Sequence, residues 1–435
     1  MRLTVVGIGA DGWSGLSLTA REALRRAETI VGSERQLSLL PRELPGARRP
    51  WPSPIKPLLE ELIAAVEDAG SAAEARCASA EEAKAHSEPA QEARSGRHGQ
   101  AEVCVLASGD PMLHGIGATL ARRISGEHLT VVPHPSAFAL ACARLLWPQA
   151  DVALVSAVGR PLAVVARVLQ PGRRVVVFLS GEDGAARLSS LLCERGFGGS
   201  RFVVLEQLGS SSERVRESTA TLWGERAADP LHLVAIECSP CSHAQMLPLI
   251  AGLPDEAYAT DGQLTKWPVR AIALAALKPM PGQLLWDVGA GSGSVGIEWM
   301  RMEPSASAIA IEADAARAKR AAANAQALGV PGLEVRHGRA PSALVNLPSP
   351  AAIFLGGGVA LPGMLQTCWQ ALSDGGRIVA NAVTLEGEQA LAAARARYGG
   401  ELLQVAISDA RPLGSFMAWK PRRPLVQWAA RKERL

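Results

Sequence analysis

A glycine-rich turn between two apolar runs constrains the fold of this chain more than any other feature. The apolar run Leu284–Val288 leads into the turn Gly289–Gly293, and a helix-like segment begins at Ser294. A second apolar run ends in Glu312, nineteen residues after Gly293. A strand, a glycine turn, a helix and a carboxylate at the tip of the next strand form half of a nucleotide-cofactor site. We therefore predict a doubly wound α/β domain around this segment.

A different glycine turn lies near the amino end. It reads Val5-Val6-Gly7-Ile8-Gly9-Ala10-Asp11-Gly12, and a related turn, Ser108-Gly109-Asp110-Pro111, follows later. Pro111 fixes the backbone of that second turn, and Gly109 lets a ligand approach the main chain closely. Two dissimilar cofactor sites in one polypeptide predict two chemical operations on one substrate or pathway.

Composition limits the class of protein. The length of 435 residues predicts two or three domains, and 48% hydrophobic with 20% charged residues is typical of soluble globular proteins. The balance of 45 basic against 42 acidic residues argues against a nucleic-acid coat. No apolar run reaches the roughly 18 residues that cross a membrane. The first residues indicate a strand and not a secretory signal, so we expect no membrane partner and a cytoplasmic location.

Two minor features remain open at this stage. A basic cluster near the carboxyl end, for which we expect a solvated tail, has attraction of a polyanionic ligand as its alternative role: Arg422, Arg423, Arg431, Lys432 and Arg434. Seven scattered cysteines indicate a reducing compartment and no disulfide framework. The spacing of Cys238, Cys241 and His243 lacks a second ligand pair, so we expect structural thiols and no metal site.

The order of the segments predicts the domain organisation. Strand and helix patterns alternate over residues 1–250, which indicates an α/β domain, except that 68–100 contain almost no large apolar residues. We expect that stretch to be a disordered insertion, because it cannot bury enough surface to offset its ordering entropy. A linker at 251–258 follows, and the alternation then resumes through a second α/β domain over 259–435.

The second domain resembles a class I methyltransferase, a Rossmann-like fold that uses S-adenosyl-L-methionine. Asp287 directly before the glycines, and the G-x-G-x-G spacing in place of G-x-G-x-x-G, favour this cofactor over a nicotinamide dinucleotide. The finer resemblance is to the family of domains that methylate and decarboxylate precorrins. It is carried by the segments 261–270 (DGQLTKWPVR), 337–344 (HGRAPSAL) and 354–358 (FLGGG).

That resemblance implies the residues that contact the cofactor in the second domain. They are Thr265, Gly289, Ala290, Gly291, Ser292, Gly293, Glu312 and Ala340. Glu312 stands where relatives commonly carry Asp, and its longer carboxylate can accept the same two hydrogen bonds from a ribose diol.

The first domain resembles the tetrapyrrole methylase family, in which two α/β lobes clamp S-adenosylmethionine. Five short motifs occur in that family's order: 7–12, 31–35, 108–111, 135–136 and 155–160. The resemblance implies that the cofactor contacts Gly7, Gly9, Asp11, Gly109, Asp110, Pro111, Leu113 and Ser136. For Asp110, anchoring the loop and touching the ligand are equally open. Relatives often carry His in the last motif, and this chain has Ala157-Val158 there.

Together the two resemblances imply an enzyme of cobalamin biosynthesis. It would hold two molecules of S-adenosylmethionine, methylate two meso carbons of a precorrin and decarboxylate an acetate side chain. Methyl transfer needs alignment and exclusion of water more than an acid–base pair, and no catalytic residue is singled out. Arg270, Arg339 and Arg411 are candidate clamps for the carboxylates of the precorrin, because guanidinium binds carboxylate bidentately. We expect a homo-oligomer.

Three alternatives stay open. A methyltransferase of RNA or of another small molecule would act through the second domain, but the first domain is neither basic nor rich in aromatic residues, as an RNA partner would require. A nicotinamide oxidoreductase is disfavoured by the glycine spacing. A scaffold whose first domain binds tetrapyrrole without reacting is the third alternative.

Overall fold

The computed structural model describes residues 2–68 and 102–433 and divides them into two compact units. The first unit contains residues 1–158, 174–186 and 201–237, and the second contains 159–173, 187–200 and 238–435. The expected insertion at 68–100 lies, apart from Asp68, outside the described residues. The domain boundaries expected from the sequence stay predictions. The second unit also includes residues 159–173 and 187–200, which the sequence assigns to the first domain.

The first unit begins with a five-stranded, wholly parallel sheet of order β3-β2-β4-β1-β5. Its central strands are continuous apolar runs, as expected of strands buried on both faces. The strands are β1 (Arg2–Ile8), β2 (Thr29–Gly32), β3 (Ala47–Pro50), β4 (Glu102–Ser108) and β5 (Leu129–Val132). The helices are η1 (Gly12–Gly15), α1 (Leu18–Arg26), α2 (Glu34–Ser38), a helix at 56–68 and α4 (Ile116–Leu120).

A second, mixed sheet has the order β6-β7-β10-β8-β9, in which only β6 and β7 are parallel. Its strands are β6 (Val152–Ser156), β7 (Arg174–Phe178), β8 (Arg201–Glu206), β9 (Arg214–Thr219) and β10 (His232–Glu237). The helices along this stretch are α5 (Ala137–Leu145), η2 (Gln149–Asp151), η3 (Leu162–Arg167), α6 (Gly184–Glu194) and α7 (Ala220–Trp223). Two sheets of different pattern confirm the expected two-lobed first half.

The second unit is built on a seven-stranded sheet of order β13-β12-β11-β14-β15-β19-β16. The first five strands are parallel, and β19 is antiparallel to both of its neighbours. The strands are β11 (Leu284–Val288), β12 (Ser307–Glu312), β13 (Glu334–His337), β14 (Ala352–Leu355), β15 (Arg377–Ala382), β16 (Glu401–Val405) and β19 (Leu425–Arg431). The order turns at β11, so the glycine turn lies at the switch point where α/β sheets bind ligands.

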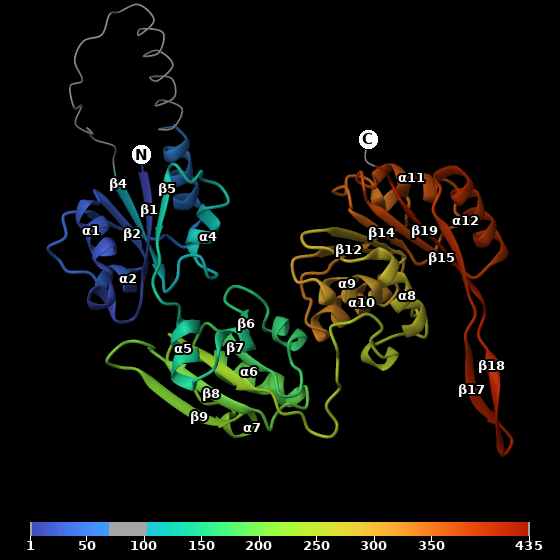
Figure 1. Cartoon of the computed structure of the whole chain (residues 1–435), viewed down its shortest axis with the longest axis horizontal. Coiled ribbons are helices and arrows are strands. Elements are labelled where there is room, and N and C mark those ends of the chain that lie inside the picture. The colour runs from blue at the N-terminus through green and yellow to red at the C-terminus, as the bar shows by residue number, and fades with distance from the viewer. Residues whose placement is uncertain (1, 69–101, 434–435) are drawn as a thin grey trace, which may run out of the picture. The chain divides into compact units, whose positions relative to one another are not determined.

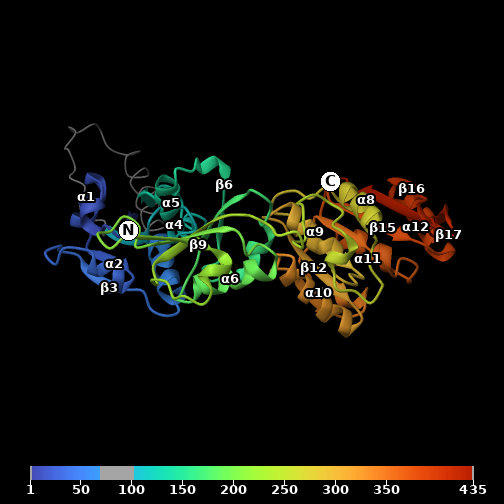
Figure 2. The ribbon, with the colours of Figure 1, turned by 90° about the horizontal axis from the view of Figure 1, so that it is seen from below.

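Helices cover both faces of this sheet, and α9 and α10 lie beside β12 in both Figure 1 and Figure 2. Successive strand residues feed opposite cores, with Leu285 in the core under α8, α9 and α10 and Trp286 in the core under α11 and α12. The helices are η4 (Asp255–Ala257), α8 (Trp267–Leu277), α9 (Ser294–Met302), α10 (Ala315–Ala327), η5 (Ser342–Leu344), α11 (Met364–Ala371) and α12 (Leu385–Tyr398). The doubly wound fold is confirmed. No helix within 2–68 or 102–433 could cross a membrane.

The end of the sheet corrects one expectation. The basic cluster was expected in a solvated tail, but residues 425–431 between its members form β19, which lies between β15 and β16, and Trp428 in that strand is fully buried. Before it, β17 (Ser408–Leu413) and β18 (Phe416–Pro421) form a separate two-stranded hairpin, visible in Figure 1. Of the basic cluster, Arg422 and Arg423 lie in the turn before β19, Arg431 ends that strand and Lys432 follows it, while Arg434 lies outside the described residues.

Candidate functional site

The glycine turn of the second unit lines a cavity of about 550 Å³, which we call the carboxy-terminal pocket. Gly289, Gly291 and Gly293 all have positive φ, at 73°, 59° and 76°, so the backbone here suits glycine. A Cβ on Gly289 would lie 3.1 Å from the backbone nitrogen of Gly357, because a second glycine turn after β14 packs against the first. The missing side chains keep main-chain groups open to a ligand at this edge of the sheet.

Glu312 lies at the tip of β12 and lines the same pocket, as its position in the sequence predicts. Its Oε2 accepts a hydrogen bond from the Gly291 N–H at 2.7 Å, and its Oε1 accepts one from the Asp314 N–H at 3.0 Å. A carboxylate has about four acceptor positions, so these two bonds orient the group and leave lone pairs for a ribose diol. Glu312 thus connects the glycine turn to the next strand.

Asp287, the last acid before the glycines, is buried and faces the start of α9. Its Oδ2 accepts from the Gly296 N–H at 2.9 Å, and its Oδ1 has no partner among the described residues. Burial raises the pKa of this carboxyl to about 7, the Glu312 charge adds to the rise, and the bond from Gly296 opposes it. Asp287 therefore holds the start of α9 beside the glycine turn and does not itself line the carboxy-terminal pocket.

The other expected contacts in the second half separate into two groups. Thr265, Ala290 and Ala340 line the carboxy-terminal pocket together with Gly289, Gly291 and Glu312. Ser292 and Gly293 do not line it, because Ser292 is buried and Gly293 starts α9 close to Ala321. Those two residues belong to the packed side of the turn, away from the pocket.

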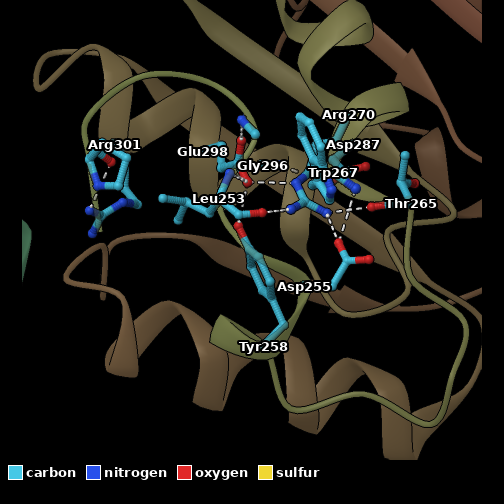
Figure 3. Close-up of polar contacts among 12 residues, drawn as sticks. Leu253, Asp255, Tyr258, Thr265, Trp267, Arg270, Asp287, Gly296, Glu298 and Arg301 are labelled. Atoms are coloured by element: carbon cyan, nitrogen blue, oxygen red, sulfur yellow. Dashed lines mark hydrogen bonds and ion pairs between the residues drawn. The ribbon is translucent and has the colours of Figure 1, made fainter. Parts of the chain in front are cut away.

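Arg270 is not a clamp for substrate carboxylates, which corrects the expectation from the sequence. It is completely buried in α8, and its Nε donates to Glu298 Oε1 at 2.5 Å (Figure 3). Its other nitrogens donate to Asp255 and to the backbone carbonyls of Thr265 and Leu253. With every guanidinium nitrogen bonded inside the protein, Arg270 positions the segment before the glycine turn and does not face the pocket.

Glu298 is the acceptor that holds this segment in place. Besides Arg270 it accepts from the backbone N–H groups of Gly252 and Leu253, at 2.6 and 3.0 Å, and from the Tyr258 hydroxyl at 2.8 Å. Burial raises the pKa of the Tyr258 phenol, and the Glu298 charge adds to the rise, so the phenol stays a donor. The stretch 251–258, expected to be a linker, is thereby packed against α9.

The other two arginines have different positions. Arg339 follows β13, is exposed and lines the carboxy-terminal pocket. Arg411 lies on the hairpin strand β17 and lines a separate cleft of about 720 Å³, beside Trp267 and Asp409. Two more lining arginines, Arg422 and Arg423, are unexpected as pocket residues, because the sequence places them in a solvated tail.

A second cavity, of about 460 Å³, lies in the first unit and is called the amino-terminal pocket. Gly9, Gly109, Asp110, Leu113 and Ser136 line it, as expected. The Asp110 Oδ1 accepts from the Met112 N–H at 2.8 Å, which closes a turn of the loop. That bond favours the anchoring role for Asp110.

The remaining expected residues of the first half, Gly7, Asp11 and Pro111, do not line the amino-terminal pocket. A Cβ on Gly7 would lie 2.4 Å from the Gly109 carbonyl oxygen and 2.7 Å from the His134 Cβ. The Asp11 Oδ1 lies 3.6 Å from the buried His134 Nε2. Gly7 therefore allows close packing beneath the loop. Asp11 lies near His134, a residue that no sequence signal indicated, but its Oδ1 has no hydrogen-bond partner among the described residues.

Two further residues of the amino-terminal pocket were missed as site residues. Arg35 and Gln36, at the start of α2, both donate to the Ser108 hydroxyl, at 3.1 and 3.0 Å. Ser33 caps α2 and shares a capping box with Gln36. The Ser-x-x-Gln pattern was a usable signal for the cap, but only the fold brings it to Ser108.

Replacing Glu312 by alanine should weaken S-adenosylmethionine binding in the carboxy-terminal pocket alone. We expect a loss of about 1.5–3 kcal/mol, because a charge-assisted hydrogen-bonding group disappears. Calorimetric titration of the full chain measures it. Glu334→Ala is the matched control, since Glu334 is exposed on the neighbouring strand and pairs with Arg336. Equal affinities for the Glu312 and Glu334 variants would make Glu312 a structural strand-end acid.

Comparison with known proteins gives two family matches. The model described as "Tetrapyrrole (Corrin/Porphyrin) Methylases" matches residues 2–222, and the one described as "Precorrin methyltransferase domain" matches 256–432. The described residues contain no cluster of three or more His, Cys, Asp or Glu that could hold a metal ion.

Relatives similar to nearly the whole chain carry one name. Precorrin-6Y C(5,15)-methyltransferase [decarboxylating] of a Sinorhizobium species is 42% identical over 98% of this chain and 95% of its own length. The enzyme of that name from Mycobacterium tuberculosis (strain CDC 1551 / Oshkosh) is also 42% identical, over 99% of this chain and 100% of its own. The solved C-terminal domain of precorrin-6Y C5,15-methyltransferase from Rhodobacter capsulatus is 44% identical, covers 43% of this chain and 100% of itself, and has a TM-score of 0.41.

Proposed function

This chain belongs to the precorrin-6Y C(5,15)-methyltransferase (decarboxylating) family, and from this premise we infer that it holds two molecules of S-adenosylmethionine, one in each pocket. The enzyme adds two methyl groups to meso carbons of a precorrin and decarboxylates an acetate side chain, in cobalamin biosynthesis. The observation that carries the two-site proposal is that the pockets share no lining residue and each has its own glycine turn.

The residues of the carboxy-terminal pocket fit the cofactor. Glu312 offers a carboxylate to the ribose, and Gly289 and Gly291 offer open main chain to the methionine part. Thr265 and Ala340 line the pocket from two further segments. The volume of about 550 Å³ is within the range of small-molecule sites.

The residues of the amino-terminal pocket also fit, in a different way. Gly9 and Gly109 come from two neighbouring parallel strands, β1 and β4, whose carboxyl ends meet at one edge of the sheet. Ser136 caps α5 with its hydroxyl, and Leu113 adds an apolar wall. Polar recognition here comes mainly from the backbone, as the family resemblance implies for the loop that contains Gly109.

Methyl transfer requires mainly that the protein align the methyl donor with the reacting carbon of the substrate. When bound, the cofactor would supply an activated methyl group on a sulfonium. The electron-rich ring carbon of the substrate would bond to that methyl carbon in line as its bond to sulfur breaks, with S-adenosylhomocysteine as the leaving group. Each pocket would align the methyl group of the cofactor with the ring carbon of the substrate and keep water away from both. Such alignment can lower the activation barrier without a strong acid or base. Loss of carbon dioxide from the acetate leaves the electron pair of the broken carbon–carbon bond, which the adjoining macrocycle can hold until a proton takes the place of the carboxylate. We propose that the carboxy-terminal domain carries that step together with one methylation, as the family resemblance implies.

The two-site proposal predicts a stoichiometry near two in calorimetric titration of the full chain with S-adenosylmethionine. Glu312→Ala should leave one strong site, because it affects only the carboxy-terminal pocket. A stoichiometry of one in the unaltered chain, or tight binding of a nicotinamide dinucleotide, would contradict the proposal. Methylation of RNA by the chain would favour the alternative function. We also expect a cytoplasmic homo-oligomer, which fractionation of cells and light scattering on the purified protein test.

A further inference from the structure

The carboxy-terminal pocket is unusually rich in cations for a site that receives a cation. Five of its lining residues carry positive side chains and one carries a carboxylate: Lys266, Arg317, Arg339, Arg422, Arg423 and Glu312. S-adenosylmethionine itself has a net charge of about +1, from a sulfonium, an ammonium and a carboxylate. Like charges in one small cavity repel, so this lining calls for an additional anionic occupant.

Three of the five cations are already paired with acids. Arg317 binds Asp261 at 2.8 Å, Lys266 lies 3.5 Å from Asp255, and Arg422 makes two bonds to Asp409, at 2.6 and 2.7 Å. Each of these three cations has an acidic partner, although Asp261 is shared with Arg320 and Asp255 with Arg270. The lining cations that have no acidic partner are the other two guanidinium groups.

Arg339 and Arg423 are those two groups. Both are exposed, and neither side chain has a hydrogen bond or ion pair with any residue in the described part of the chain. Arg339 comes from the loop after β13, beside Ala340, and Arg423 comes from the turn between β18 and β19. Two segments more than eighty residues apart in the sequence thus each supply one unpaired guanidinium to the same cavity.

The amino-terminal pocket provides an internal contrast. Its charged lining residues are Arg35 and Asp110, one of each sign, and Arg35 donates to Ser108. No excess of positive charge remains there once its two histidines are taken as neutral. The two cofactor pockets of one chain therefore differ in electrostatics although they take the same cofactor.

We propose that Arg339 and Arg423 bind carboxylates of the precorrin, and that these carboxylates, by neutralising the two guanidinium groups, raise the affinity of the carboxy-terminal pocket for S-adenosylmethionine. This inference rests on the proposed function of the pocket. The coupling is reciprocal, so bound cofactor strengthens substrate binding by the same factor. After methyl transfer the cofactor product, S-adenosylhomocysteine, has lost the sulfonium charge, and the coupling that held it falls away.

The test uses the double variant Arg339→Gln/Arg423→Gln of the full chain at low ionic strength, without substrate. Removing two positive charges from the lining of the pocket should tighten S-adenosylmethionine binding about threefold to tenfold. S-adenosylhomocysteine binding should stay nearly unchanged. The KM for the precorrin should rise at least about tenfold, because two bidentate anchors are lost. In the calorimetric titration, binding to the carboxy-terminal pocket is identified as the phase that disappears in the Glu312→Ala variant.

Arg336→Gln is the matched control. Arg336 lies on β13, three residues before Arg339, and it is exposed, paired with Glu334 and absent from the pocket lining. Its variant should leave both affinities unchanged. Weaker binding of both cofactor forms by the double variant would overturn the proposal, since the arginines would then hold the carboxylate of the cofactor. An unchanged ratio of the two affinities would overturn it as well. If the Glu312→Ala variant binds S-adenosylmethionine in the same phases as the unaltered chain, the proposed function of the pocket is contradicted instead.

Discussion

Replacement of Arg270 by methionine is expected to lower the free energy of unfolding of the second unit by about 3–5 kcal/mol. The guanidinium is fully buried, and it neutralises Glu298, which is 1% exposed. Without it a carboxylate stays buried and uncompensated, and the carbonyls of Thr265 and Leu253 lose their donors. Denaturant unfolding followed by tryptophan fluorescence measures the loss, since Trp286 and Trp299 are buried in the same unit.

Two companion variants separate the charge effect from lost packing. Tyr258→Phe removes one hydrogen bond to the same carboxylate and should cost only about 1 kcal/mol. Adding Glu298→Gln to Arg270→Met should recover part of the stability, because no unpaired charge then remains in the core. If the free energy of unfolding of Arg270→Met lies within about 1 kcal/mol of that of the unaltered chain, water reaches this network and Arg270 is replaceable.

Replacement of Gly7 by alanine should abolish one of the two methylations and leave the other intact. The added Cβ would lie 2.4 Å from the Gly109 carbonyl oxygen and 2.7 Å from the His134 Cβ, and neither atom is the end of a flexible side chain. The loop that contains Gly109 must therefore move, and a displacement near 1 Å can cost about 100-fold in rate. Mass measurement of the products after incubation with the precorrin substrate should reveal a species one methyl group short.

Gly126→Ala is the control in the same unit, because a Cβ there meets no atom within 4 Å. It should give the fully methylated product. If Gly7→Ala also gives two methylations, the amino-terminal pocket is not a methyl-transfer site, and the alternative of a tetrapyrrole-binding scaffold gains support. Loss of decarboxylation in Gly7→Ala would contradict the assignment of that step to the carboxy-terminal domain.

The backbone of both sites could be predicted from the sequence because local pattern determines it. The apolar run ending at Val288, the glycines after it and the acid Glu312 are spaced as one strand–turn–helix–strand unit requires. Their roles depend on neighbours close in the chain, and the structure places Glu312 against Gly291 accordingly.

The role of Arg270 could not be obtained in this way. Its partner Glu298 lies 28 residues further on, in a different helix, and a sequence does not say which of several acids will meet a given arginine. An arginine before a glycine loop fits a substrate clamp as well as a buried anchor. Only the packing of α8 on α9 distinguishes the two roles. The position of His134 beneath Gly7 likewise follows from packing and not from a local sequence pattern.

The basic residues near the carboxyl end misled the sequence interpretation for a related reason. Charged residues at 422–423 and 431–432 flank the short run Leu425–Ala430, so composition favours a solvated segment. Yet Leu425, Gln427 and Trp428 are buried between two other strands, and the charges lie at the strand ends. Tertiary pairing overrides composition when the segment fills a gap in a sheet.

The position of β19 also determines when this unit can finish folding during synthesis. The strand comes last among the seven of its sheet, yet it lies inside the sheet, and β16 pairs with no other strand in the described ranges. Until residues 425–431 have left the ribosome, β15 exposes an open edge and β16 has no partner. The glycine turn and part of the pocket can therefore form during synthesis before β19 joins β15 to β16 and completes the sheet. A stop codon before residue 425 would leave that edge open permanently, as a template for pairing with other chains.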